Sequence, residues 1–130
     1  MDKKFITTII CDDEIQMREY LKEIVTEMGY EVIAEANNGE EVIQLYNEKK
    51  PDLLFLAVNI PYKNGFEVLE EIIKLHPQAF IIIVSSLADI ETITRCIDIG
   101  AYNYIRKDTS REKIKSIIKE TRDYYLREKL

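Results

Sequence analysis

The stretch "PDLLFLAVNIPYKNGFEVL", residues 51–69, decides the fold of this chain. A nearly continuous apolar run leads into a turn with Pro61 and Gly65, and then into a segment with apolar residues at helical spacing. An apolar run without alternation is typical of a parallel strand that helices cover on both faces. Catalytic groups of such proteins gather where the strands end, and the residue at this strand end is Ala57.

The same unit occurs five times along the chain. Short apolar runs, each followed by a longer segment with helical spacing, read "FITTIIC" (5–11), "YEVIAEA" (30–36), "DLLFLAV" (52–58), "FIIIVSS" (80–86) and "YNYIRK" (102–107). This alternation predicts an α/β protein of (βα)5 form, with a doubly wound, parallel, five-stranded sheet. The second run alternates polar and apolar residues as an edge strand does, so we expect it to be outermost.

Two helical segments carry further expectations. The fourth segment has an apolar stripe that predicts a buried face, formed by Ile90, Ile93, Cys96 and Ile97. The last helix is expected over about residues 110–128. No linker or low-complexity segment interrupts the pattern, so we expect residues 1–130 to form a single domain.

Bulk composition excludes several classes of function. The 130 residues include 18 Lys and Arg against 24 Asp and Glu, and the net charge of −6 disfavours direct binding to nucleic acid or to anionic membranes. No apolar stretch approaches the roughly 20 residues that span a bilayer, and the N-terminus lacks a signal core, so a cytoplasmic location is expected. Cys11 and Cys96 form neither a metal-binding pair nor a disulfide framework.

Polar residues follow four of the five expected strands, where a parallel sheet would bring them together. They are Asp12, Asp13 and Glu14; Asn59; Ser85 and Ser86; and Arg106, Lys107 and Asp108. Adjacent carboxylates repel one another, and carboxylate and carbonyl oxygens are the ligands that Mg²⁺ prefers, so the first group indicates a cation site. The alternative is that these acids cap the following helix, and the residues alone leave both readings open.

The segments "CDDE" (11–14), "IIIVSS" (81–86) and "GAYNYIRKD" (100–108), together with the opening stretch, carry a family resemblance. In this order and spacing they resemble the receiver (REC, CheY-like) domain of two-component response regulators over essentially the whole chain. The resemblance implies a flavodoxin-like sheet of order 2-1-3-4-5. The roles that it implies are Mg²⁺ binding for Asp12, Asp13 and the backbone carbonyl of Asn59, phosphoryl contacts for Ser85 and Lys107, and an aromatic switch for Tyr104.

Ala57 stands where the family has its phosphoaccepting aspartate. An alanine has no nucleophilic atom, the amide of Asn59 is a poor nucleophile, and Asp52 lies at the opposite end of the strand. The resemblance therefore predicts a receiver that accepts no phosphoryl group. It is either a naturally phosphorylation-independent module or an engineered inactive variant, and the retained pocket residues favour a receiver that was once active.

The resemblance also implies partners. These are a sensor histidine kinase or phosphotransfer protein, and a second copy bound through the face formed by the fourth helix, the last strand and the last helix. "KDTS", residues 107–110, is similar to receivers joined to a DNA-binding output domain, which this chain does not contain. A flavodoxin-like enzyme is disfavoured, because the loop after the first strand is acidic and His76, the one histidine, is far from the strand ends.

Overall fold

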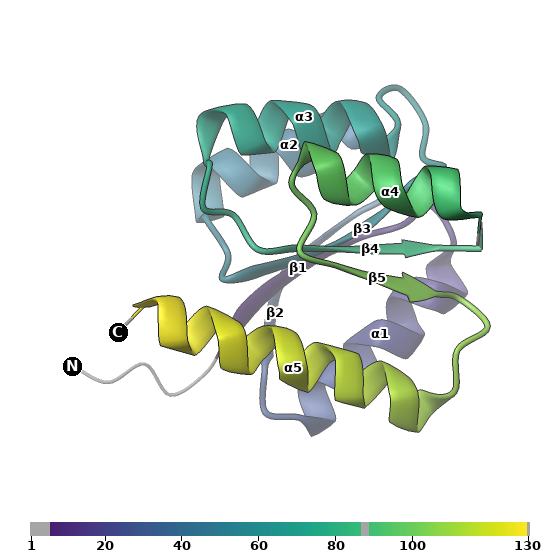
Figure 1. Cartoon of the computed structure of the whole chain (residues 1–130), viewed down its shortest axis with the longest axis vertical. Coiled ribbons are helices and arrows are strands. Elements are labelled where there is room, and N and C mark those ends of the chain that lie inside the picture. Colours follow the sequence, from purple (N-terminus) through teal and green to yellow (C-terminus); the bar gives the residue numbers. More distant parts are fainter. Residues whose placement is uncertain (1–5, 87–88, 130) are drawn as a thin grey trace.

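The computed structural model describes residues 6–86 and 89–129, which form a three-layer α/β arrangement. Figure 1 shows α2, α3 and α4 on one face of the sheet and α1 and α5 on the other. The elements are β1 (Thr7–Cys11), α1 (Ile15–Glu27), β2 (Glu31–Ala36), α2 (Gly39–Lys49), β3 (Leu53–Ala57), α3 (Gly65–Leu75), β4 (Ile81–Ser85), α4 (Ile90–Ile99), β5 (Asn103–Arg106) and α5 (Arg111–Lys129). None of these helices is long and apolar enough to cross a membrane.

The five strands form one parallel sheet in the order β2-β1-β3-β4-β5. The predicted (βα)5 architecture, the order 2-1-3-4-5 and the outer position of the second strand are therefore confirmed. The first strand begins at Thr7, and Phe5 of the expected run lies outside the described residues.

The sheet separates two hydrophobic cores because successive side chains of a strand point to opposite faces. Leu54 and Leu56 of β3 pack in the core beneath α2, α3 and α4, whereas Leu53 and Phe55 pack in the core beneath α1 and α5. Every residue of β3 and β4 is buried. This two-sided burial explains why both strands are apolar throughout.

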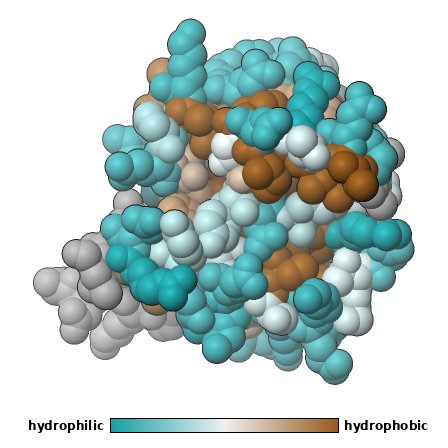
Figure 2. All heavy atoms as spheres, viewed as in Figure 1, coloured by the Kyte–Doolittle hydropathy of each residue, from teal (hydrophilic) through white to brown (hydrophobic). Residues whose placement is uncertain are grey.

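The helix α4 departs from the expectation of a buried stripe. Cys96 is its one buried residue, while Ile90 is 81% and Ile97 is 43% exposed. Figure 2 shows hydrophobic residues at the surface where α4 lies in Figure 1, on a face that is otherwise largely hydrophilic. The pattern predicts correctly that these apolar residues lie on one side of the helix. Most of that side, however, is not covered by the rest of the described chain.

At the amino ends of the strands, Asp52 connects three elements. The Asp52 carboxylate accepts hydrogen bonds from the Thr7 backbone N–H (2.8 Å) and from the Thr7 hydroxyl (3.0 Å). The Tyr125 hydroxyl of α5 donates to its other oxygen. Asp52 is buried, so these donors replace the water that the carboxylate gives up on folding.

We expect Asp52→Asn to destabilise the fold, because an amide group would face donors that now bind a carboxylate oxygen. The expected loss is about 1–3 kcal/mol in the free energy of unfolding, measured by urea denaturation. Asp98→Asn, at an exposed position of α4, is the matched control and should change little. Equal midpoints for the two variants would contradict this role of Asp52.

Candidate functional site

Asp12 is held rigidly at the carboxyl end of β1. Its side chain is buried, with 1% of the residue exposed, and its Oδ1 accepts a hydrogen bond from the Glu14 N–H (3.0 Å). Its own N–H donates to the Ala36 carbonyl (3.1 Å), and Arg18 Nη1 donates to its carbonyl oxygen (2.8 Å). The backbone and one carboxylate oxygen of Asp12 are thus fixed, while Oδ2 faces the neighbouring loop.

Lys107 approaches Asp12 from the end of β5. Its Nζ lies 2.8 Å from Asp12 Oδ2 and also contacts the Glu14 carboxylate, and its side chain is 18% exposed. No hydrogen bond of good geometry reaches Asp12 Oδ2 among the described residues, so this contact is an ion pair of imperfect alignment. The backbone N–H of Lys107 donates to the Ser85 carbonyl (3.0 Å). These contacts join the loops after β1, β4 and β5.

Burial shapes the electrostatics of this cluster. Burial raises the pKa of Asp12 above its usual range, although the Lys107 ammonium and the Glu14 N–H act in the opposite direction. Burial alone would lower the pKa of Lys107, but its contacts with the carboxylates of Asp12 and Glu14 outweigh this and raise it. A carboxylate with a raised pKa carries its negative charge at a cost, and a cation beside it lowers that cost.

The acids after β1 do not cap α1 through their side chains. Glu14 is the N-cap residue, and its side chain makes no capping hydrogen bond. Asp12 binds the N–H of Glu14, which precedes the helix. By contrast, Asn38, Asn64 and Asp89 cap α2, α3 and α4. Neither Asp12 nor Glu14 therefore makes the side-chain cap that the second of the two readings expects.

Ala57 is the last residue of β3 and is 2% exposed. The following turn is fixed by its backbone: the Gly65 N–H donates to the Val58 carbonyl (2.7 Å), and a Cβ at position 65 would lie 2.5 Å from the Ala57 carbonyl oxygen. Only a glycine fits this approach. The turn therefore depends on Gly65 and on backbone contacts, and not on the side chain at position 57.

Tyr62, in the same turn, has a positive φ of 69° and is 79% exposed. A left-handed backbone is unfavourable for a tyrosine and costs roughly 1–2 kcal/mol. The Gly39 N–H donates to the Pro61 carbonyl (3.1 Å), and a Cβ on Gly39 would lie 2.0 Å from the Lys63 carbonyl oxygen. The close contact with Gly39 thus holds both neighbours of Tyr62.

Ser85 and Tyr104 lie on the neighbouring strands. Ser85 ends β4 and is buried, and Tyr104 pairs with Ile83 in the sheet register. Burial raises the pKa of Tyr104, and the Ser85 side chain partly offsets this. The Tyr104 hydroxyl is buried and has no hydrogen-bond partner of good geometry within the described ranges. Its ring thus points inward towards the end of β4.

The structure brings Asp12 and Lys107 into direct contact, and it puts Ser85 next to them through the Lys107 N–H. Asp13 and Asn59 are exposed in the adjoining loops. Within residues 6–86 and 89–129, no group of three or more His, Cys, Asp or Glu side chains could hold a metal ion. Sequence analysis grouped Glu14 with the acids of the expected cation site but did not predict its contact with Lys107, and it gave no role to Arg18, which also contacts the cluster.

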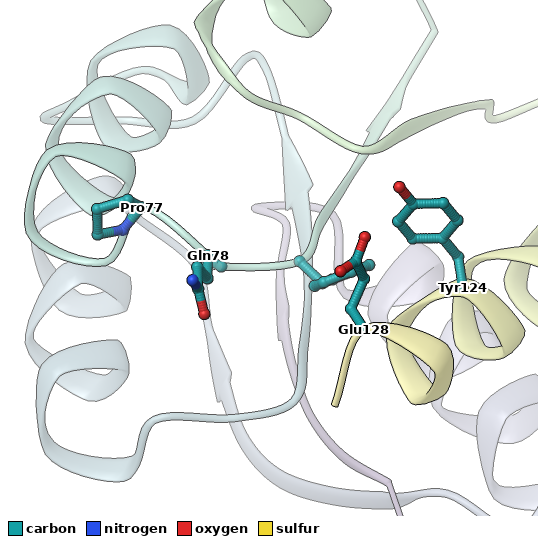
Figure 3. A pocket seen from close by; sticks show the side chains of 6 residues that line it. Pro77, Gln78, Tyr124 and Glu128 are labelled. Carbon is teal, nitrogen blue, oxygen red and sulfur yellow. The ribbon is translucent and has the colours of Figure 1, made fainter. Parts of the chain in front are cut away.

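A hollow of about 300 Å³ lies at the other end of the sheet, between the α3–β4 connection and the last turns of α5. Figure 3 shows Pro77 and Gln78 on one side and Tyr124 and Glu128 on the other. Phe80 and Ala79 complete its lining. None of the polar residues predicted for the site lines this hollow.

The sheet order and the cluster at its carboxyl edge define a receiver-type α/β protein. Residues 8–119 match the model of the response regulator receiver domain family, so the chain belongs to this family. It is a CheY-like receiver domain of a two-component system.

Known relatives agree with this assignment. The chain is 39% identical over 99 residues to the chemotaxis protein CheY of Thermotoga maritima, which covers 76% of this chain and 82% of that protein. It is 34% identical over 125 residues to the probable C4-dicarboxylate response regulator DctR of Bacillus subtilis, which covers 95% of this chain. The match covers 55% of DctR, so the chain spans about half of that relative's length.

Solved structures of receiver domains also resemble this chain. A CheY-like receiver domain protein from Methanospirillum hungatei has a TM-score of 0.87 at 27% identity, with 95% of this chain and 98% of that chain covered. CheY in the CheX-CheY-BeF3-Mg+2 complex from Borrelia burgdorferi has a TM-score of 0.86 at 26% identity, with 88% and 87% covered.

The raised pKa of Asp12 predicts a specific pH dependence. At a pH above the pKa that Asp12 has in the folded state, its carboxylate is charged, and burial makes this charge more costly in the folded than in the unfolded chain. Asp12→Asn should therefore be more stable than the parent at neutral pH without metal. This difference in stability should shrink as the pH falls from the pKa of Asp12 in the folded state to the lower pKa of an unperturbed aspartate. Thermal unfolding in metal-free buffer between neutral pH and pH about 4 measures this.

Asp89→Asn is the control of opposite sign. The Thr92 backbone N–H and hydroxyl lower the pKa of Asp89, so its stabilising contribution is present at neutral pH and is lost on acidification. A stability difference for Asp12→Asn that grows on acidification would contradict the expected sign.

Proposed function

We propose that this chain is a receiver domain in a two-component phosphorelay that accepts no phosphoryl group at the usual position. The observation that carries the proposal is the cluster of Asp12, Lys107 and Ser85 at the carboxyl edge, beside a strand that ends in Ala57. In-line phosphoryl transfer needs a nucleophile as well as groups that neutralise charge. The carboxyl ends of these strands have groups that can neutralise charge, but position 57 has no nucleophile.

Mg²⁺ is the cation that we propose for this edge. Asp12 and Asp13 would provide carboxylates and Asn59 a backbone carbonyl, and Asp12 Oδ2 is a buried oxygen that faces a cation already. Two carboxylates suffice for Mg²⁺, which keeps several waters. The missing carboxylate at position 57 weakens this site. When bound, the ion would neutralise charge on phosphoryl oxygens.

The roles that we propose for the remaining residues are those of the family, and the burial of these residues supports them. Ser85, buried at the end of β4, would contact a phosphoryl group, and Lys107 would pair with its oxygens. Tyr104 would be the switch residue, and its inward ring with a buried hydroxyl fits a side chain that responds to Ser85. None of these residues is proposed to make the chain an enzyme.

The proposed partners are a sensor histidine kinase or phosphotransfer protein, in a cytoplasmic setting. In the complex named above, CheY is bound to another protein, CheX, which supports a role in protein–protein interaction for the receiver fold. We propose that residues 1–130 form one receiver domain, and that a homodimer would use the α4-β5-α5 face, where Ile90 and Ile97 are exposed. The match to about half of DctR supports an origin in a longer response regulator, and the resemblance of "KDTS" to receivers with a DNA-binding output domain is the reason to propose transcription regulation.

The second candidate is a phosphorylation-independent interaction module. The observation that favours it is that the Lys107 ammonium already pairs with the carboxylates of Asp12 and Glu14, so this lysine has anionic partners without a phosphoryl group. Under both readings the chain binds partners through the receiver fold. They differ in whether restoring the acceptor restores a switch.

Ala57→Asp is the variant that decides between them. We expect no covalent adduct on the parent and a phosphoryl adduct on Ala57→Asp, after treatment with a small-molecule phosphodonor and Mg²⁺, detected by intact mass. Ala57→Asn is the matched control, since it has the shape of aspartate without its nucleophile. A phosphoryl adduct on an aspartate of the parent would overturn the proposal, and a phosphorylated Ala57→Asp without any change in association would favour the independent module.

The same substitution should lower stability in the absence of metal. A further carboxylate beside Asp12 and Asp13 adds repulsion of about 1 kcal/mol, so Ala57→Asp should have the lower midpoint in metal-free thermal unfolding. Added Mg²⁺ should stabilise Ala57→Asp more than the parent, because ligands that bind the folded state raise its stability. A lower metal-free midpoint for the parent would show that the edge does not carry the expected repulsion.

A further inference from the structure

The hollow between the α3–β4 connection and the last turns of α5 combines aromatic rings with a carboxylate (Figure 3). The rings of Phe80 and Tyr124 line it, and Glu128 carries the only full charge among the described residues of its lining. Aromatic faces and a carboxylate both attract a planar cation, because each presents negative charge to it. The volume of about 300 Å³ is at the lower end of the range for small-molecule sites.

The aromatic wall of this hollow is held in place by other rings. The ring centroid of Tyr124 lies 4.9 Å from that of Tyr102 and 6.2 Å from that of Phe80. Phe80 is 9% exposed and packs edge-on against Tyr125, with 5.0 Å between the centroids. The Tyr125 hydroxyl donates to the buried carboxylate of Asp52, which fixes this turn of α5. A wall that is formed before a ligand arrives lowers the entropy cost of binding.

The opposite wall is the α3–β4 connection, which its backbone fixes. The Ala79 N–H donates to the His76 carbonyl (3.0 Å), and the Phe80 carbonyl accepts from the Leu54 N–H of β3 (3.0 Å). Gln78 therefore lies on an anchored segment across the hollow from α5 (Figure 3). Its side-chain carbonyl can accept a hydrogen bond from a cationic N–H group.

The ring of Tyr124 already attracts a guanidinium group of the chain itself. The Cζ atom of Arg127 lies over this ring, 5.5 Å from its centroid. Neither Arg127 nor any other described Lys or Arg lines the hollow. A neighbouring hollow of about 480 Å³ shares the α3–β4 connection, but Lys50 lines it together with Asp52, so it offers a cation no net negative charge. The charge of the lining therefore favours the hollow beside Glu128.

We propose that this hollow binds a small organic cation of the guanidinium or amidinium class. The plane of the cation lies against the rings of Phe80 and Tyr124, and its N–H groups donate to the Glu128 carboxylate and to the side-chain carbonyl of Gln78. The bound cation joins the last turns of α5 to the α3–β4 connection. This site is independent of the proposed phosphoryl chemistry, because the hollow shares no residue with the cluster of Asp12 and Lys107.

Benzamidine is the probe for this site, since it is a flat amidinium ion on an aromatic ring. Benzamide has the same shape without the charge and is the matched control compound. For a molecule of this size we expect a dissociation constant on the order of 1 mM. Removing the charge of Glu128 should weaken binding by about threefold to fivefold, which is the range of an ion pair at an exposed position.

The first experiment titrates the parent, Glu128→Gln and Glu70→Gln with benzamidine, and the parent with benzamide, and follows the backbone amide shifts by NMR. Glu70 is exposed on α3 and does not line the hollow, so its variant gives the same change in net charge at another place. We expect saturable shifts at Gln78, Phe80 and Glu128 in the parent. Glu70→Gln should bind as the parent does, while Glu128→Gln and benzamide should show the weaker binding.

Four results would overturn the proposal. They are the absence of a saturable shift up to about 20 mM benzamidine, equal binding of benzamide, equal weakening in Glu70→Gln and Glu128→Gln, and shifts centred on the acidic loop at residues 12–14. Tighter binding of the peptide acetyl-Gly-Arg-Gly-amide than of benzamidine would assign the hollow to an arginine of a partner protein, and it would also overturn the proposal of a free cation.

Tyr124→Leu tests the ring separately from the charge. Leucine keeps an apolar side chain next to Phe80 but has no aromatic face, so benzamidine should bind about threefold more weakly. Benzamidine should accordingly raise the midpoint of thermal unfolding less for Tyr124→Leu than for the parent. Equal affinities of the parent and Tyr124→Leu would exclude the ring from the site and refute the proposal. Glu128→Gln, a change at an exposed residue, keeps the test decisive if Tyr124→Leu unfolds.

Discussion

The burial of β3 and β4 on both faces is the constraint on which the rest of this structure depends. Every residue of these strands is buried, so neither strand can shift by one residue without moving its whole side-chain pattern to the wrong core. Parallel pairing at this fixed register aligns the carboxyl ends, where Ala57 pairs with Val84 next to Ser85. The residues at the carboxyl ends of the strands are therefore positioned by packing in the two hydrophobic cores, and not by contacts within the site.

Most of this architecture could be predicted, because it follows from the period of apolar residues. The continuous runs "DLLFLAV" and "FIIIVSS" indicated buried parallel strands, and the alternating "YEVIAEA" indicated the edge strand. The period does not say what covers a helix face, which is why Ile90 and Ile97 of α4 are exposed although they share a stripe with buried Cys96. A sequence shows which residues lie together on a helix, and only the packed structure shows whether another element covers them.

The candidate site likewise has contacts that the sequence predicts and contacts that it does not. Sequence position alone indicated that Asp12 and Lys107 would meet, because both follow strands of one parallel sheet. The contact of the Glu14 carboxylate with Lys107 could not be predicted. An exposed carboxylate at an N-cap position can also bind the free N–H groups of its own helix. Which partner it takes depends on burial and charge at residues that are distant in sequence.

Ala57 contributes no charge or polar group to the carboxyl end of β3, and the structure around it does not need one. Ala57 packs with the core beneath α2, α3 and α4, and the turn after it is held by the backbone bond from Gly65 to Val58. These contacts involve no side-chain polar atom at position 57, so the packing and the turn there do not require one. The cation at the carboxyl ends of these strands is the chain's own Lys107, which β5 brings to Asp12 from the other side of β3 and β4.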